Sequence, residues 1–177
     1  MGAIKRLRGT PLPITSYFIG KAISVFASMV VQVLILLAIG VAFFGLNMPT
    51  EPSKWITFTW LLILGTASST ALGVAFSSVP KNGRGASAIV SPVVIILQFF
   101  SGVFFVFTQL PGWMQQVAAI FPLKWLTQGM RSVFLPDTFA AQEVAKSWEG
   151  GRTAIILFVW LVVGLFFAVK TFRRENK

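Results

Sequence analysis

The 177-residue sequence is 55% hydrophobic and 11% charged, less than half of the roughly 25% charged residues that soluble domains carry. This composition favours a lipid bilayer over water as the main solvent of the chain. The absence of cysteine and histidine excludes a disulfide framework, a thiolate metal site and the commonest general base. The formal net charge is +10, and its distribution along the chain indicates topology rather than nucleic-acid binding.

Residues 1–20 form a cationic segment in front of a long apolar run. Lys5, Arg6 and Arg8 precede Pro11, which stops any helix that begins here. A signal peptide would need an apolar region of about 7–15 residues followed by a small-residue cleavage site. The apolar run here is much longer, so we expect a retained first span. The three cations either fix topology and bind anionic lipid headgroups, or dock a partner.

Four apolar runs are long enough to cross a membrane as helices. They cover residues 22–46, 55–79, 87–107 and 153–169. A hydrocarbon core about 30 Å thick needs roughly 20 helical residues, and the shortest run is flanked by Arg152 and Lys170, whose long side chains reach the interface. Soluble helices would show a polar face, which these runs lack. We therefore predict an all-α fold, a polytopic transmembrane helical bundle over residues 21–177.

Small residues recur at four-residue intervals in the second predicted span. They are Gly65, Ser69, Gly73 and Ser77. Such a stripe lets the backbone of another helix approach closely. Packing within the chain explains the stripe, and contact with a second subunit is the alternative.

The third predicted span ends in an aromatic-rich stretch that reaches from Phe99 to Trp113. Bulky rings at this end of a span either line an apolar pathway or form an interfacial belt and ordinary packing. The sequence leaves both interpretations open.

Residues 108–152 are too polar to span a membrane but are rich in tryptophan and broken by prolines. One helical face carries Leu123, Leu126, Met130, Val133 and Phe134, and the other carries Lys124, Thr127, Gln128, Arg131 and Ser132. This pattern predicts an amphipathic helix at the membrane–water boundary. We expect an outer re-entrant or interfacial hairpin of two short helices that meet at Pro122. Its marker residues are Pro111, Trp113, Pro122, Trp125 and Arg131.

The distribution of Lys and Arg predicts the orientation of the chain. With four spans and a cytosolic amino terminus, ten cations and one acid lie inside, and five cations and four acids lie outside. Lys and Arg resist translocation, so we expect a multi-pass protein of the cytoplasmic membrane with both termini cytosolic.

The interiors of the four predicted spans contain no ionisable residue. Proton- and ion-coupled carriers usually keep such residues there because they form the relay. The sequence also lacks a glycine-rich phosphate loop and a nucleophile–base set. We expect no catalytic site, no metal and no cofactor, so any uphill transport would draw its energy from another chain.

The order of these features resembles the type-2 ABC exporter permeases, the membrane subunits of daunorubicin-resistance-like drug-efflux and polysaccharide-export systems. The stretch KRLRGTPLPITSYFIGK resembles the segment before the third span of that family, and LPGWMQQVAAIFPLKWLTQGMRSVFL resembles its outer re-entrant hairpin. The similarity covers nearly the whole chain. Family members usually have six spans, so the resemblance implies a carboxy-terminal part without the first two.

The resemblance also implies partners and a function. The family's ATPase-coupling helix falls on Lys5, Arg6, Leu7, Arg8, Gly9, Thr10, Pro11 and Leu12. The partners implied are a separate ABC ATPase subunit, which binds the ATP, and a second permease copy or a related permease. The function implied is export of hydrophobic or amphipathic drug, lipid or saccharide cargo. A non-transporting membrane anchor or assembly protein is the alternative.

Overall fold

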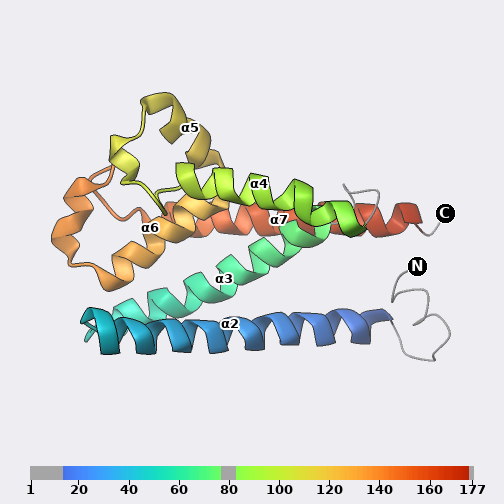
Figure 1. The fold of residues 1–177 in the computed structure, drawn as a ribbon, viewed down its shortest axis with the longest axis horizontal. Helices are drawn as coiled ribbons and strands as arrows, with labels where there is room; N and C mark the ends of the chain where they lie inside the picture. Colours follow the sequence, from blue (N-terminus) through green and yellow to red (C-terminus); the bar gives the residue numbers. More distant parts are fainter. Residues whose placement is uncertain (1–13, 77–82, 176–177) are drawn as a thin grey trace. The chain divides into compact units, whose positions relative to one another are not determined.

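A computed structural model describes residues 14–76 and 83–175 of the chain. Its elements are α2 (Ile14–Phe44), α3 (Pro52–Phe76), α4 (Gly83–Phe100), η1 (Phe107–Gln109), α5 (Gly112–Ile120), α6 (Pro122–Phe134), η2 (Asp137–Gln142) and α7 (Gly150–Glu175). Helices are the only regular elements in these two described ranges, which confirms the predicted all-α class (Figure 1).

The chain divides into two compact units, Met1–Met48 and Pro49–Lys177. In the first unit, α2 runs for 31 residues through a sequence free of proline, which would break it. Gly45 follows the helix with a φ of 63°, a left-handed conformation that glycine adopts without steric cost. The N–H of Leu46 then donates to the carbonyl of Gly40 over 3.0 Å, so a backbone hydrogen bond closes this turn.

In the second unit, α3 packs closely against α6 and α7. Its buried face carries Phe58, Leu61, Gly65, Ser68 and Ala71, which recur every three or four residues as one helical face requires. A Cβ atom built on Gly164 of α7 would lie only 2.9 Å from the backbone carbonyl carbon of Ala71. The two helices therefore approach each other at the level of their backbones, as small residues permit.

Glycines also set the contact between α3 and α6. A Cβ on Gly129 would lie 2.6 Å from a terminal carbon of Leu61, and a Cβ on Gly65 would lie 2.7 Å from one of Leu126. Each leucine thus occupies the space that a side chain larger than glycine's would take up on the facing helix. The result is a three-helix core built from α3, α6 and α7.

Three described helices are long and apolar enough to cross a membrane: Ala22–Phe44, Pro52–Phe76 and Gly150–Lys170. The apolar part of α4 is shorter and covers Val90–Phe100. The predicted continuous span over 87–107 is therefore wrong beyond Phe100. The physical reason is Gly102, whose φ of 78° ends the helical conformation although the hydrophobic run continues.

The predicted pair of short helices is confirmed. α5 and α6 meet at Phe121, which lies at the end of the first and the start of the second. Pro122 is the first residue of α6, the position where its missing N–H costs no hydrogen bond. In Figure 1 the segment from residue 101 to residue 149 gathers at one end of α3, α4 and α7. We call α5 and α6 the hairpin.

Candidate functional site

Part of the polar face of α6 is turned into the protein. A helix at the membrane–water boundary would keep its polar face in water, yet Lys124 is only 4% exposed and Gln128 is fully buried. This corrects the expected orientation of the amphipathic helix. The segment after η2 folds back and covers Lys124 and Gln128, whereas Thr127, Arg131 and Ser132 of the same face stay partly exposed.

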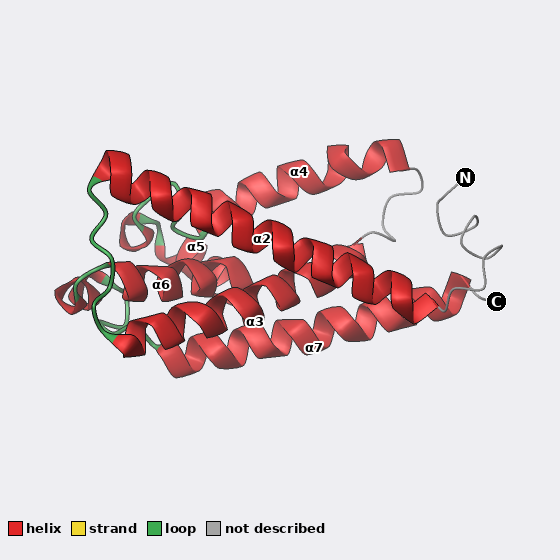
Figure 2. Cartoon of the chain, turned by 90° about the horizontal axis from the view of Figure 1, so that it is seen from below, coloured by secondary structure: helices red, strands yellow, loops and turns green. Residues whose placement is uncertain are grey.

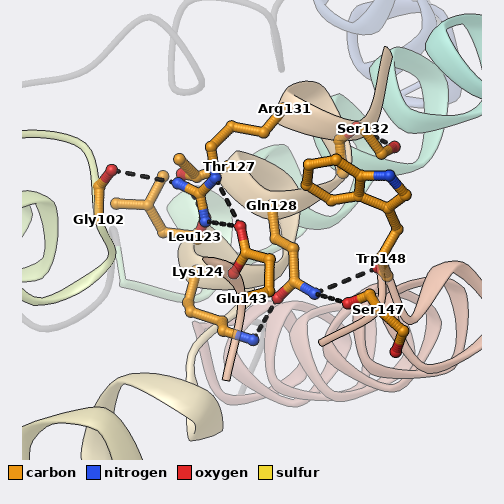
Figure 3. Close-up of polar contacts among 11 residues, drawn as sticks. Gly102, Leu123, Lys124, Thr127, Gln128, Arg131, Ser132, Glu143, Ser147 and Trp148 are labelled. Atoms are coloured by element: carbon orange, nitrogen blue, oxygen red, sulfur yellow. Dashed lines mark hydrogen bonds and ion pairs between the residues drawn. The ribbon is translucent and has the colours of Figure 1, made fainter. Parts of the chain in front are cut away.

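Lys124 and Gln128 hold that covering segment in place. The Lys124 Nζ donates to the Gln128 Oε1, and the Gln128 Nε2 donates to the carbonyls of Ser147 and Trp148 over 3.3 and 3.2 Å (Figure 3). A glutamine amide can accept and donate at once. It therefore connects a cation on α6 to the backbone just before α7.

Aromatic rings surround the Lys124 ammonium. Its Nζ lies 3.6 Å from the ring centroid of Trp125 and 5.1 Å from that of Phe107, both within the range of cation–π attraction. Burial lowers the pKa of Lys124 from 10.5 to about 8, while the negative charges of Glu149 and Glu143 act to raise it. The ammonium is thus a buried cation whose charged form is disfavoured by desolvation.

Arg131 connects three separate segments. Its Nε and Nη2 both contact the Glu143 Oε1 at 2.9 Å, and its Nη1 donates to the carbonyl of Gly102 over 3.3 Å (Figure 3). The Glu143 side chain is only 7% exposed. One guanidinium therefore joins α6 to the turn that ends α4 and to the residue that follows η2. We call Lys124, Gln128, Arg131 and Glu143 the hairpin cluster.

Further polar contacts lie around this cluster. Lys54, in the first turn of α3, donates to the carbonyl of Leu135 over 3.3 Å and lies 3.5 Å from the Asp137 carboxylate. The Asp137 side chain is 72% exposed, and exposed ion pairs contribute roughly 0–1 kcal/mol. The part-buried hydrogen bond to the backbone therefore positions Lys54 more firmly than its ion pair with Asp137 does.

Tryptophan N–H groups fix the hairpin against its neighbours. The Nε1 of Trp160 on α7 donates to the carbonyl of Ile120 over 2.7 Å, and its ring stacks on that of Phe121 with centroids 6.2 Å apart. The Nε1 of Trp125 donates to the carbonyl of Ala119, also over 2.7 Å. The junction of α5 and α6 is thereby held on both sides.

A groove of about 320 Å³ lies beside the hairpin cluster. It is lined by residues 102–108 and by Arg131, Leu135, Phe139, Gln142, Glu143 and Trp148. Its walls are mostly aromatic and aliphatic, and the ion pair between Arg131 and Glu143 is its main polar feature. Grooves with apolar walls and a few convergent polar groups are the usual form of small-molecule sites.

Residues 2–170 match the family model of the ABC-2 family transporter proteins. The chain belongs to this family. Membership makes it a membrane permease of an ABC transporter, a class that normally works with an ABC ATPase. Neither a curated protein nor a solved structure matches the chain.

The structure places the marker residues of the permease hairpin as follows. Pro111 precedes α5, and Trp113 on α5 is 60% exposed. Pro122 begins α6, Trp125 is buried within it, and Arg131 is the connecting residue described above. Of these five residues, Trp125 is buried and Arg131 is partly buried, with its side chain 24% exposed.

The predicted small-residue stripe is divided between two faces of α3. Gly65 is buried under Leu126, whereas Ser69 and Gly73 are exposed, and Ser77 lies outside the described residues. The helix is rotated so that Gly65 shares its packing face with Ser68 and Ala71 instead. Contact of the exposed pair with a second subunit stays a prediction.

Sequence reasoning missed Gly164, although a signal for it was present. Gly164 and Ala168 are small residues spaced by four in the last apolar run, and Ala168 is buried as well. The predicted ATPase-coupling residues, Lys5 to Leu12, lie outside the described residues. Among the described residues, no group of three or more His, Cys, Asp or Glu side chains is arranged to hold a metal ion.

Proposed function

We propose that this ABC-2 permease is part of an exporter that moves hydrophobic or amphipathic cargo, such as a drug, a lipid or a saccharide, across the cytoplasmic membrane. The observation that carries the proposal is the family match on a chain whose apolar runs contain no interior ionisable residue. Walls of this kind accept apolar cargo and offer no relay for protons or ions. The groove beside the hairpin cluster, with aromatic walls and one ion pair, suits an amphipathic molecule in the same way.

The energy for export would come from a separate ABC ATPase. The cationic segment from Lys5 to Leu12 is the docking element in this proposal, and its proline stop makes it a stiff lever. Two permease halves would alternate between inward and outward access as the ATPases close and open. The excess of Lys and Arg around the chain ends and the short loop after α3 supports a cytosolic position for this lever.

Reversal of charge in the cationic segment tests the docking role. In the full-length chain, Arg6→Glu combined with Arg8→Glu should abolish co-purification of the ATPase while membrane insertion continues. The matched control is Arg173→Glu combined with Arg174→Glu, which changes the charge by the same amount near the other terminus and should retain the ATPase.

Three outcomes would count against the proposal. Equal recovery of the ATPase with both double variants would remove the docking role from the cationic segment. Labelling of a cysteine at position 5 by an impermeant maleimide in intact cells would place that segment outside. A genomic neighbourhood without a reading frame that contains GxxxxGK[ST] would favour the membrane anchor instead.

A further inference from the structure

α4 is held much less firmly than the other long helices of its unit. Its described side chains from residue 90 to residue 99 are mostly exposed, with Val94 at 43% and Ile96 at 52%. Its main neighbours are α5 and α6, near its hairpin end. Figure 2 shows α4 set apart from α3 and α7, which run closely side by side.

The hairpin end of α4 has a defined structure. Gly102 adopts a φ of 78° and reverses the chain, so the rings of Phe104 and Phe105 fold back against Phe99, with centroids 5.1 and 5.7 Å from it. Residues other than glycine rarely adopt this backbone conformation. The turn is therefore specified at a single residue.

Arg131 supplies the polar link from this turn to the hairpin. A Cβ built on Gly102 would lie 3.2 Å from the Arg131 Nη1, so the guanidinium lies directly against the turn. The largely buried Glu143 binds the other edge of the guanidinium and fixes its direction. The planar fork of arginine can reach both partners at once, whereas a lysine ammonium has no such fixed fork.

We propose that Gly102 is the hinge of α4 and that Arg131 is the positioning residue of this hinge. With Glu143, Arg131 holds the hairpin end of α4 while the rest of the helix changes its distance from α7. The hinge is a property of the chain itself, and only its use during cargo release rests on the proposed function. Hinges of this kind are a few residues at element ends that absorb backbone rotation.

Distance measurements between spin labels test the hinge. The natural sequence has no cysteine, so a Val94→Cys, Val159→Cys pair reports the distance from α4 to α7 in lipid nanodiscs without background labelling. Both native side chains are well exposed. Arg131→Gln and Glu143→Gln should each lose the narrow distance distribution of the parent and give a broad one. Arg131→Lys should restore it in part.

The matched control is the pair Ile63→Cys, Val159→Cys, which joins α3 to α7. Both positions are exposed on helices that pack along their length, so this distribution should stay narrow in every variant. Because Arg131 and Glu143 act as one unit, the variant with both changes should broaden the α4–α7 distribution no more than either change alone.

Two results would overturn the inference. An unchanged α4–α7 distribution in Arg131→Gln and Glu143→Gln would show that the link does not position α4. Equal broadening of both label pairs would show general loss of structure. Gly102→Ala, which keeps both residues of the ion pair, would then have to broaden only the α4–α7 pair for the hinge to stand. The measurement needs neither ATPase nor cargo, so it can fail while the proposed function holds, and the reverse is also true.

Discussion

Replacement of Gly164 by alanine should destabilise the permease by separating α3 from α7. The added methyl carbon would lie 2.9 Å from both the backbone carbonyl carbon and the Cβ of Ala71, and 3.0 Å from the backbone nitrogen of Leu72. Backbone atoms cannot rotate away as the end of a flexible side chain can. The two helices must therefore move apart until these contacts relax, which loosens packing along the interface.

The expected net loss is about 1–2 kcal/mol in the free energy of unfolding. Overpacking of a close contact costs roughly 1–3 kcal/mol, and the change from glycine to alanine inside a helix returns up to about 1 kcal/mol. Gly73→Ala is the matched control, because a Cβ there meets no described atom within 4 Å. This control should be neutral or slightly stabilising.

Unfolding of the purified protein in mixed micelles, followed by the fluorescence of its six tryptophans, measures this difference. Gly164→Ala should unfold at a lower denaturant concentration than the parent, and Gly73→Ala should not. If Gly164→Ala proved as stable as Gly73→Ala, the close approach of α3 and α7 would be refuted.

The remaining predictions concern the hairpin. Because burial lowers the pKa of Lys124 from 10.5 to about 8, its charge opposes folding below pH 8, and this opposition fades as the pH rises towards 10.5, where the unfolded chain also loses the proton. The gap between the two pKa values corresponds to a rise of roughly 3 kcal/mol in the free energy of unfolding of the parent. Lys124→Met should lack this rise when unfolding is measured at pH 7 and at pH 10. An identical rise in both proteins would contradict the assignment. Trp160→Phe on α7 removes the donor to the carbonyl of Ile120 and should lower the free energy of unfolding by about 0.5–1.5 kcal/mol. The control is Trp113→Phe, which replaces an exposed tryptophan of the hairpin and should unfold like the parent.

The helices were predictable because the evidence for them is local. Apolar runs of membrane length identified α2, α3 and α7, and Pro122 marked the junction between α5 and α6 through its own backbone geometry. The end of α4 was not predictable from hydrophobicity, since apolar residues continue to Phe107. The carbonyl of Gly102 accepts a hydrogen bond from Arg131, 29 residues further along the chain, a contact that sequence spacing alone does not reveal.

The burial of the polar face of α6 was hidden for a similar reason. Lys124 and Gln128 form a polar stripe on any helical projection of the sequence, and only the return of Ser147 and Trp148 covers it. The rotation of α3 is also a tertiary property. Its packing face passes through Ser68 rather than Ser69 because α6 and α7 approach from that side.

The hairpin cluster is better explained by positioning than by stability. Burial makes the charge of Lys124 unfavourable, and buried ion pairs such as that of Arg131 with Glu143 are often no more stable than apolar replacements of equal volume. The glycine contacts of α3 with α6 and α7 already supply a close-packed core. Polar groups, however, act in fixed directions, and those of the cluster fix the turn at Gly102 and the segment at Ser147 and Trp148. Lys124→Met should therefore raise the stability at pH 7 and yet increase hydrogen exchange at the backbone amides of residues 143–149. A variant that became more stable without faster exchange there would show that Lys124 has no positioning role.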